Sequence, residues 1–281
     1  MPATDLASFG TVATGLDHPE GVAVGPDGVL YAGGEAGQVY RIGPDGSADE
    51  IASTGGFLYG LTLDRAGNVY ACDFGNAAVM RISADGTVST HSTGTVDRPM
   101  RVPNFAAFDD EGNLYVTDSG EWGDDDGLVY RVAPGGATEV WTAAAPRFPN
   151  GCCLTAAGDA LLVVESHGRA IVRVPFEDGG SAGRPEPIAD LSGSQPDGIA
   201  LADDGTMLVG CYRPDRVYEI APDGRIEVFA DDPDGVVLNQ PANVAFHGPE
   251  LDRIVVSSLG GWSLADAPAG RPGLPLRYPT V

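Results

Sequence analysis

One repeated unit runs through almost the whole sequence. It consists of a polar or proline-led pair, an apolar run, an Asp/Gly turn, a second apolar run and a third strand, and it recurs six times. The second residues of the six units are spaced 39, 45, 46, 47 and 45 residues apart; they are Glu20, Tyr59, Asn104, Asn150, Asp197 and Ala242. Short β-branched and aromatic runs separated by such turns are typical of antiparallel hairpins. A period near 45 residues with four strands predicts one propeller blade per unit.

The six units leave no room for a long linker, and the period is not interrupted by a change in composition. They cover 19–33 with 38–46, 58–72 with 78–86, 103–117 with 128–136, 149–164 with 170–178, 196–210 with 216–224, and 241–257. The sequence therefore predicts an all-β fold, a six-bladed β-propeller, as one domain over residues 1–281. The sixth unit lacks an outer strand of its own. We expect the N-terminal strand at residues 7 to 14 to complete that last blade.

Charge and composition exclude several classes of function. The formal net charge is −24, and all 16 basic residues are arginine. Nucleic acid and anionic membranes are therefore unsuitable partners, and lysine chemistry is excluded. The N-terminus lacks the features of a secretory signal, and no apolar run is long enough to span a membrane, so a cytoplasmic location is expected. Four cysteines without zinc-type spacing predict reduced, buried thiols; they are Cys72, Cys152, Cys153 and Cys211.

The aligned second residues have a predictable place. The first strand of a propeller blade lies nearest the axis, so residues just before it surround one end of the central channel. We call this end the mouth and the six aligned residues the mouth ring. Asp-Gly and Asn-Gly are also common turn dipeptides, but the turn glycines of this sequence fall about eight residues later in each unit. Local turn chemistry therefore leaves the oxygen-bearing members of the ring unexplained: Glu20, Asn104, Asn150 and Asp197.

Two carboxylates and two amide oxygens that converge on an axis would form a site with a charge of −2. Such a site suits one hard divalent cation, and Ca²⁺ fits it best. Mn²⁺, Mg²⁺ or Zn²⁺ remain alternatives. The sequence thus predicts that Glu20, Asn104, Asn150 and Asp197 are metal ligands.

Several motifs carry a family resemblance. PEGVAVGPDGVLYAG at 19–33, PNG at 149–151 and PDGIALADDGTMLVGCYRPDRVYEIAPDG at 196–224 resemble the SMP-30/gluconolactonase/luciferin-regenerating-enzyme family, and GRPGLPLRYP at 270–279 is similar to that family's ending. The resemblance implies a six-bladed propeller with one catalytic divalent metal, usually a lactonase acting on sugar lactones. It also implies that Asn104 contacts the substrate or a metal-bound water. The family often has Asn-Asp-Gly where this chain has Asn104-Phe105-Ala106.

The hypothesis is a metal-dependent lactone hydrolase in which Asp197 accepts a proton from water. Further acid or base candidates lie in loops between second and third strands: Asp73, Asp118, Glu165 and His167. Side chains expected to contact a small-molecule substrate are Arg101, Asn104, Tyr59 and Tyr212. The loop acids and His167 also have an ordinary interpretation as hydrogen-bonding loop residues.

Other functions remain open at this point. A non-hydrolytic cyclase or isomerase of a biosynthetic pathway would keep the metal, and the first unit also resembles strictosidine-synthase-like propellers. A non-catalytic binding scaffold similar to NHL propellers would not need the oxygen-bearing ring. The sequence names no protein partner.

Overall fold

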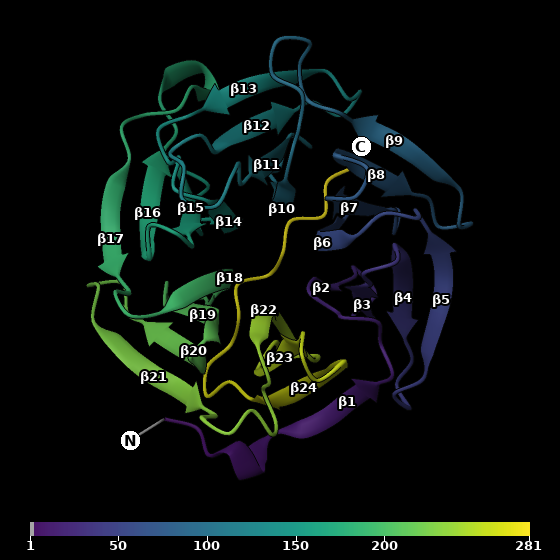
Figure 1. Cartoon of the computed structure of the whole chain (residues 1–281), viewed down its shortest axis with the longest axis vertical. Helices are drawn as coiled ribbons and strands as arrows, with labels where there is room; N and C mark the ends of the chain where they lie inside the picture. The colour runs from purple at the N-terminus through teal and green to yellow at the C-terminus, as the bar shows by residue number, and fades with distance from the viewer. Residues whose placement is uncertain (1–2) are drawn as a thin grey trace.

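The computed structural model describes residues 3–281, and these form six antiparallel four-stranded sheets around a central axis (Figure 1). The predicted six-bladed all-β propeller is confirmed. Two short 3₁₀ helices accompany the strands, η1 (Leu6–Ser8) and η2 (Asp178–Gly180). Within the described residues, no helix has both the length and the apolar character needed to cross a bilayer.

Each of the first five blades runs outward from the axis in chain order. The first blade contains β2 (Val22–Val24), β3 (Leu30–Gly33), β4 (Gln38–Ile42) and β5 (Ala48–Ser53). The second contains β6 (Leu58–Leu63), β7 (Val69–Asp73), β8 (Ala78–Ile82) and β9 (Val88–Ser92). The third contains β10 (Pro103–Phe108), β11 (Leu114–Asp118), β12 (Leu128–Val132) and β13 (Thr138–Thr142). The next two are β14 (Pro149–Leu154), β15 (Ala160–Glu165), β16 (Ala170–Pro175) and β17 (Glu186–Asp190), then β18 (Gln195–Leu201), β19 (Met207–Arg213), β20 (Asp215–Ile220) and β21 (Ile226–Asp231).

The sixth blade combines both ends of the chain. It contains β22 (Pro241–His247), β23 (Arg253–Ser258) and β24 (Ser263–Pro268), and its outermost strand is β1 (Gly10–Thr14). β1 pairs antiparallel with β24, from Gly10 opposite Asp266 to Thr14 opposite Ser263. The N-terminal strand therefore completes the last blade, as predicted. It begins three residues later than expected because Leu6–Ser8 form η1.

Glycine directly after the mouth ring allows neighbouring blades to pack closely. Gly21, Gly60, Gly151 and Gly198 hold this place in four of the blades that the structure describes. A Cβ atom on Gly151 would lie 2.5 Å from the Asp197 carbonyl oxygen and 2.7 Å from the Gly198 Cα of the next blade. The glycine of Asn150-Gly151 therefore serves the contact between blades and not a hairpin turn.

The two Asp-Gly pairs of the fifth unit have different roles. Asp197 and Gly198 lie inside β18. Gly205 has a φ of +85° in the turn that follows, a conformation that glycine adopts without steric cost. Asp204 supports that turn by accepting a hydrogen bond from the Thr206 amide at 2.9 Å. The structure thus confirms that Asp204-Gly205 forms the hairpin turn of this unit.

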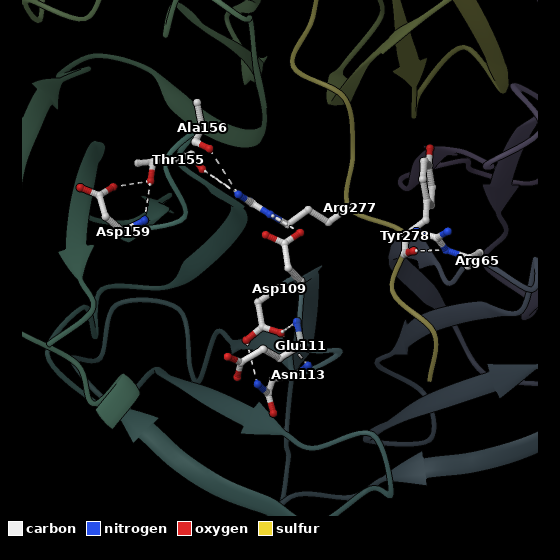
Figure 2. A network of polar contacts seen from close by, with 10 residues as sticks. Arg65, Asp109, Glu111, Asn113, Thr155, Ala156, Asp159, Arg277 and Tyr278 are labelled. Atoms are coloured by element: carbon white, nitrogen blue, oxygen red, sulfur yellow. Dashed lines mark hydrogen bonds and ion pairs between the residues drawn. The ribbon is translucent and has the colours of Figure 1, made fainter. Parts of the chain in front are cut away.

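Residues 271–279, which we call the C-terminal strap, cross the end of the channel opposite the mouth (Figure 1). The Leu274 amide donates to the Leu201 carbonyl at 2.8 Å, and the Tyr278 hydroxyl donates to the Val24 carbonyl at 2.8 Å. Figure 2 shows Arg277 reaching across to the carbonyls of Thr155 and Ala156, each at 3.4 Å. The strap therefore joins turns of several blades. Sequence analysis did not foresee this crossing.

A cavity of about 250 Å³ occupies the channel between the mouth ring and the strap. The third residue after each ring position faces it, and all six are small: Ala23, Thr62, Ala107, Cys153, Ala200 and Ala245. Strap residues from Leu274 to Tyr278 line its far end. A substrate would therefore reach the ring from the mouth.

Candidate metal centre

Four ring side chains with oxygen atoms are buried at the mouth. Asn104, Asn150 and Asp197 lie in the innermost strands β10, β14 and β18, and Glu20 lies two residues before β2. All four are buried. The other two ring positions hold Tyr59, which is partly buried, and Ala242, which is fully buried. The repeat period alone predicted this set.

Three of these four side chains carry a buried oxygen without a hydrogen-bond donor. In the described part of the chain, the buried side-chain oxygens without a partner are Asn104 Oδ1, Asn150 Oδ1, Asp197 Oδ1 and Asn243 Oδ1. An unpaired buried acceptor costs roughly 1–3 kcal/mol, so proteins rarely leave several together. A hard cation would satisfy such oxygens, because carboxylates and amide carbonyls are the ligands it prefers. The residues present therefore fit a divalent cation.

The buried carboxyl groups of Glu20 and Asp197 interact with each other. Burial raises the pKa of Asp197 to about 7, while the side-chain amide of Asn150 acts in the opposite direction. Burial, followed by the charge of Asp197, raises the pKa of Glu20 well above its usual range. A bound divalent cation would favour the ionised form of both groups.

Two tyrosines predicted to contact substrate lie beside these acids. Burial first, and then the charges of Glu20 and Asp197, raise the pKa values of Tyr59 and Tyr212. Both phenols are therefore neutral at physiological pH and can donate a hydrogen bond. The structure brings these residues together with the ring acids; their contact with a substrate stays a prediction.

Buried hydroxyl groups fix the backbone next to the candidate ligands. Each comes from the second strand of the preceding blade, or directly after it. Each donates to a carbonyl in the following inner strand or just before it: Ser257 to Glu20 at 2.6 Å, Thr117 to Asn150 at 2.7 Å, and Ser166 to Pro196 at 2.6 Å. Sequence analysis missed them. Their signal is a Ser or Thr at the end of the second apolar run in three of the six units.

Asn243 is a second residue that sequence analysis missed. Its Nδ2 donates to the Glu20 carbonyl at 3.1 Å, and its amide donates to Ser257 Oγ at 2.8 Å. The sequence alignment placed Ala242 in the ring, and Asn243 follows it directly. A polar residue in the otherwise apolar run PANVAF was the available signal.

The predicted secondary acids bind backbone amides of the loop that enters the first strand. Asp73 accepts from Phe57 at 3.2 Å, Asp118 from Arg101 at 2.7 Å, and Glu165 from Arg147 at 2.9 Å. Glu165 also pairs with the Arg147 guanidinium at 3.0 Å. Burial raises the pKa of Asp118, and the amides of Arg101, Val102 and Gly120 oppose the rise. These hydrogen bonds agree with the ordinary interpretation of Asp73, Asp118 and Glu165 as hydrogen-bonding loop residues. A role of any of them as a general base stays a prediction, and these hydrogen bonds do not support it.

Arg101 and His167 both lie at the mouth but contact other side chains. The Arg101 guanidinium pairs with Asp126 in the acidic loop between β11 and β12. His167 follows β15 and packs edge-on against Trp122, with ring centroids 5.3 Å apart. Neither contact shows whether Arg101 binds a substrate or whether His167 acts as an acid or base. Each role remains a prediction.

A separate group of ligand-type atoms lies in the loops around the first blade. Atoms of Asp17, His18 and Glu35 lie within 4.8 Å of one another, and His18 Nδ1 is 2.7 Å from Glu35 Oε2. Asp17 Oδ2 already accepts from the Ala36 amide and from Gln38 Nε2, at 3.2 and 3.1 Å. Sequence analysis assigned no metal role to these residues, and their mutual contacts account for the grouping.

The pKa values predict a pH dependence for chelator-treated protein. The folded chain keeps a proton on Asp197 up to about pH 7, whereas the unfolded chain releases it near its ordinary pKa of about 3.9. This contribution to stability is complete below the unfolded pKa and is lost as pH rises through about 7. Urea unfolding in a chelator should therefore show that Asp197→Asn gains stability relative to the natural chain between pH 5 and 8.

Two partly buried histidines require that comparison, because they act in the opposite direction. Burial lowers the pKa of His91 and of His247, so their contribution rises with pH in the same window. Both histidines are present in the natural chain and in the variant, so the difference between the two curves removes their contribution and reports Asp197 together with its interaction with Glu20. A difference that does not change with pH would contradict the prediction, and saturating Ca²⁺ should reverse the order of stability.

Fold and site together define a class of protein: six-bladed propellers with a buried centre of oxygen donors at one end of the channel. The sequence profile described as SMP-30/Gluconolactonase/LRE-like region matches residues 88–260, more than half of the chain. The chain belongs to this family. A second profile, Strictosidine synthase-like, N-terminal, matches residues 2–42.

A curated relative corresponds to the second profile. The chain is 29% identical over 225 residues to Protein STRICTOSIDINE SYNTHASE-LIKE 3 of Arabidopsis thaliana, a match that covers 74% of this chain and 53% of the relative. The chain thus spans about half the length of this curated relative.

Solved structures share the fold at low sequence identity. A gluconolactonase of Xanthomonas campestris superposes with a TM-score of 0.80 at 20% identity, covering 92% of this chain and 89% of that one. Regucalcin, a calcium-binding protein of Agrobacterium tumefaciens, gives 0.76 at 17% identity, covering 96% and 95%. A luciferin-regenerating enzyme gives 0.81 at 15% identity, covering 97% and 99%. These matches confirm the fold.

Proposed function

We propose that the protein is a divalent-cation-dependent hydrolase of a lactone or related cyclic ester. The observation that carries the proposal is the set of buried oxygens without hydrogen-bond donors, contributed by several blades at the mouth. Ca²⁺ is the cation that this donor set suits best. The family membership and the likeness to a gluconolactonase and to a calcium-binding regucalcin support the proposal. An NHL-like scaffold would not need these oxygens.

Glu20, Asn104, Asn150 and Asp197 would hold the cation. When bound, it polarises an ester carbonyl and lowers the pKa of water. The chain's own residues then handle the proton. Asp197 is the candidate base, because it is buried at the centre beside Glu20 and its Oδ1 has no hydrogen-bond donor among the described residues.

Hydrolysis of the lactone balances as follows. The water oxygen bonds to the carbonyl carbon, Asp197 takes the proton, and the ring C–O bond breaks. Asp197 then returns this proton to the ring oxygen, which becomes the hydroxyl of a hydroxy acid. Tyr59 and Tyr212 are neutral donors beside the acids and could orient the carbonyl group.

The relation to strictosidine synthase-like 3 supports a second candidate, a non-hydrolytic propeller enzyme of a biosynthetic pathway. It would use the same mouth for a condensation, cyclisation or isomerisation. A protein that binds a divalent cation but hydrolyses no lactone would favour this candidate.

Metal titration combined with a lactone panel tests the proposed function. Chelated protein should bind one Ca²⁺ per chain by calorimetry, and hydrolysis of simple and sugar lactones should rise in proportion to the occupied fraction. Mn²⁺, Mg²⁺ and Zn²⁺ serve as comparison ions. Protein that binds no divalent cation at millimolar concentration would refute the proposal.

A further inference from the structure

Exposed aromatic side chains gather at the mouth. Among residues 3–281, the large aromatic side chains that are strongly exposed are Phe74, Trp122 and Trp262, at 42%, 46% and 49%. They lie in the loops after β7, β11 and β23, which join second to third strands. These loops open on the same face as the mouth ring. Exposed aromatic surface of this kind often marks a binding site.

One aromatic group extends from the rim to the ring itself. Phe74 stacks on Tyr59 with a centroid distance of 5.4 Å and an interplanar angle of 2°. Phe57 meets Tyr59 edge-on at 4.8 Å and 71°. Tyr59 is a ring residue whose phenol lies near Glu20 and Asp197. The three rings therefore form a fixed apolar surface beside the candidate metal centre.

Two further pairs stand beside other candidate ligands. Trp122 packs against Phe148 at 4.8 Å, and Phe148 precedes Pro149 and Asn150 in the chain. Trp262 packs against His18 at 5.0 Å, two residues before Glu20. The aromatic surfaces thus come from three sides of the mouth.

The charges around the mouth do not favour an anionic ligand. The Arg101 guanidinium is paired with Asp126, and the Arg147 guanidinium is paired with Glu165. Glu35 is exposed nearby, and the chain has a net charge of −24. Arg213, exposed at the end of β19, lies near Tyr212. Its single positive charge is outweighed by the net charge of −24, so the aromatic surfaces suit a neutral apolar ligand, and repulsion by the chain's charge disfavours sugar acids or phosphates.

We propose that the substrate is an uncharged lactone or ester that carries an aromatic or similarly bulky apolar group, which packs against Phe74, Trp122 and Trp262 while its ester carbonyl reaches the ring. This inference rests on the proposed hydrolytic function and specifies its substrate class. It places the reacting carbonyl beside Asp197 and the apolar group toward the rim. A polar sugar lactone would bury less apolar area on these aromatic surfaces.

Two matched lactones test the preference. γ-Phenyl-γ-butyrolactone and γ-methyl-γ-butyrolactone share the same ring, so the ratio of their kcat/KM values reports the substituent. The Ca²⁺-loaded protein should favour the phenyl compound by about 10-fold, since aromatic contacts and apolar burial together supply the difference. Phe74→Ser and Trp122→Ser should each lower this ratio toward 1. Val140→Ser on the outermost strand of the third blade, where the side chain is 38% exposed, should leave it unchanged.

A binding experiment separates this inference from the hydrolytic function. Trp122 and Trp262 are exposed at the mouth, so tryptophan fluorescence can follow binding of 5-phenyl-2-pyrrolidinone, a lactam that resists hydrolysis. Tighter binding than that of 5-methyl-2-pyrrolidinone supports the mouth preference, even if neither lactone is hydrolysed and the hydrolase proposal fails. Hydrolysis of both lactones with equal kcat/KM, together with no preference between the lactams, would overturn the inference.

Discussion

Replacing Asp197 by Asn is expected to lower kcat/KM for a lactone about 10³-fold, because the change removes the candidate base and one of two ligand charges. The side chain keeps its shape and its Oδ1, so the innermost strand β18 should keep its place. The affinity for Ca²⁺ should fall by about 10²-fold, since ligand charge sets much of it. Steady-state kinetics and calorimetry measure the two effects separately.

Asp204→Asn provides the matched control, because Asp204 lies just beyond the other end of the same strand. Its carboxylate caps a hairpin turn and pairs with Arg271 of the strap at 2.8 Å, at the opposite end of the channel from the mouth. The control should keep full activity and lose less than about 1 kcal/mol of stability. Equal activity of the two variants would mean that Asp197 is neither base nor essential ligand.

Replacing Gly151 by Ala is expected to lower the free energy of unfolding by about 3 kcal/mol and to weaken Ca²⁺ binding as well. The new methyl group would lie 2.5 Å from the Asp197 carbonyl oxygen, 2.7 Å from Gly198 Cα and 3.0 Å from the Ile199 amide. All three atoms belong to the backbone of β18, so no side chain can rotate away. Relief requires the fourth and fifth blades to separate, and this displaces Asn150 relative to Asp197. Urea unfolding and calorimetry would record both changes.

Gly135→Ala is the control for that substitution. A Cβ at Gly135 meets no atom within 4 Å, so stability should change by less than about 0.5 kcal/mol. Gly151→Ala with unchanged stability and unchanged Ca²⁺ affinity would show that the blades can part at this point without cost.

The inner part of each blade was predictable because its signal repeats. Apolar runs separated by turn glycines, such as Gly205 with its positive φ, recur at one period and fix both the strand pairs and the blade number. The outermost strands are different. β5 has mostly exposed or partly exposed residues, so it lacks a clear apolar alternation, and only the strand count of a propeller implied it.

The strap could not be predicted, because its contacts depend on where the finished ring places distant turns. Arg277 meets Thr155 across a sequence separation of 122 residues, and the Arg65 side chain meets the Tyr278 carbonyl across 213. No local pattern encodes such contacts. The family-like ending drew attention to this segment without indicating its path.

The candidate site also contains residues that the repeat predicted and residues that it did not. Glu20, Asn104, Asn150 and Asp197 were predicted because the repeat places them at equivalent positions. Asn243 was missed because it lies one residue beyond the aligned position. The hydrogen bonds of Asp118 to backbone amides were also invisible, since they depend on how a loop folds back.

The strap also affects how the protein behaves at high concentration. A ring closed by the N-terminal strand β1 could in principle open at the seam between the sixth and first blades and exchange that strand with a neighbouring molecule. The strap leaves the sixth blade after β24 and bonds Val24 of the first blade and Arg65 of the second. It therefore spans the same seam a second time, and intermolecular strand exchange would have to break both closures at once.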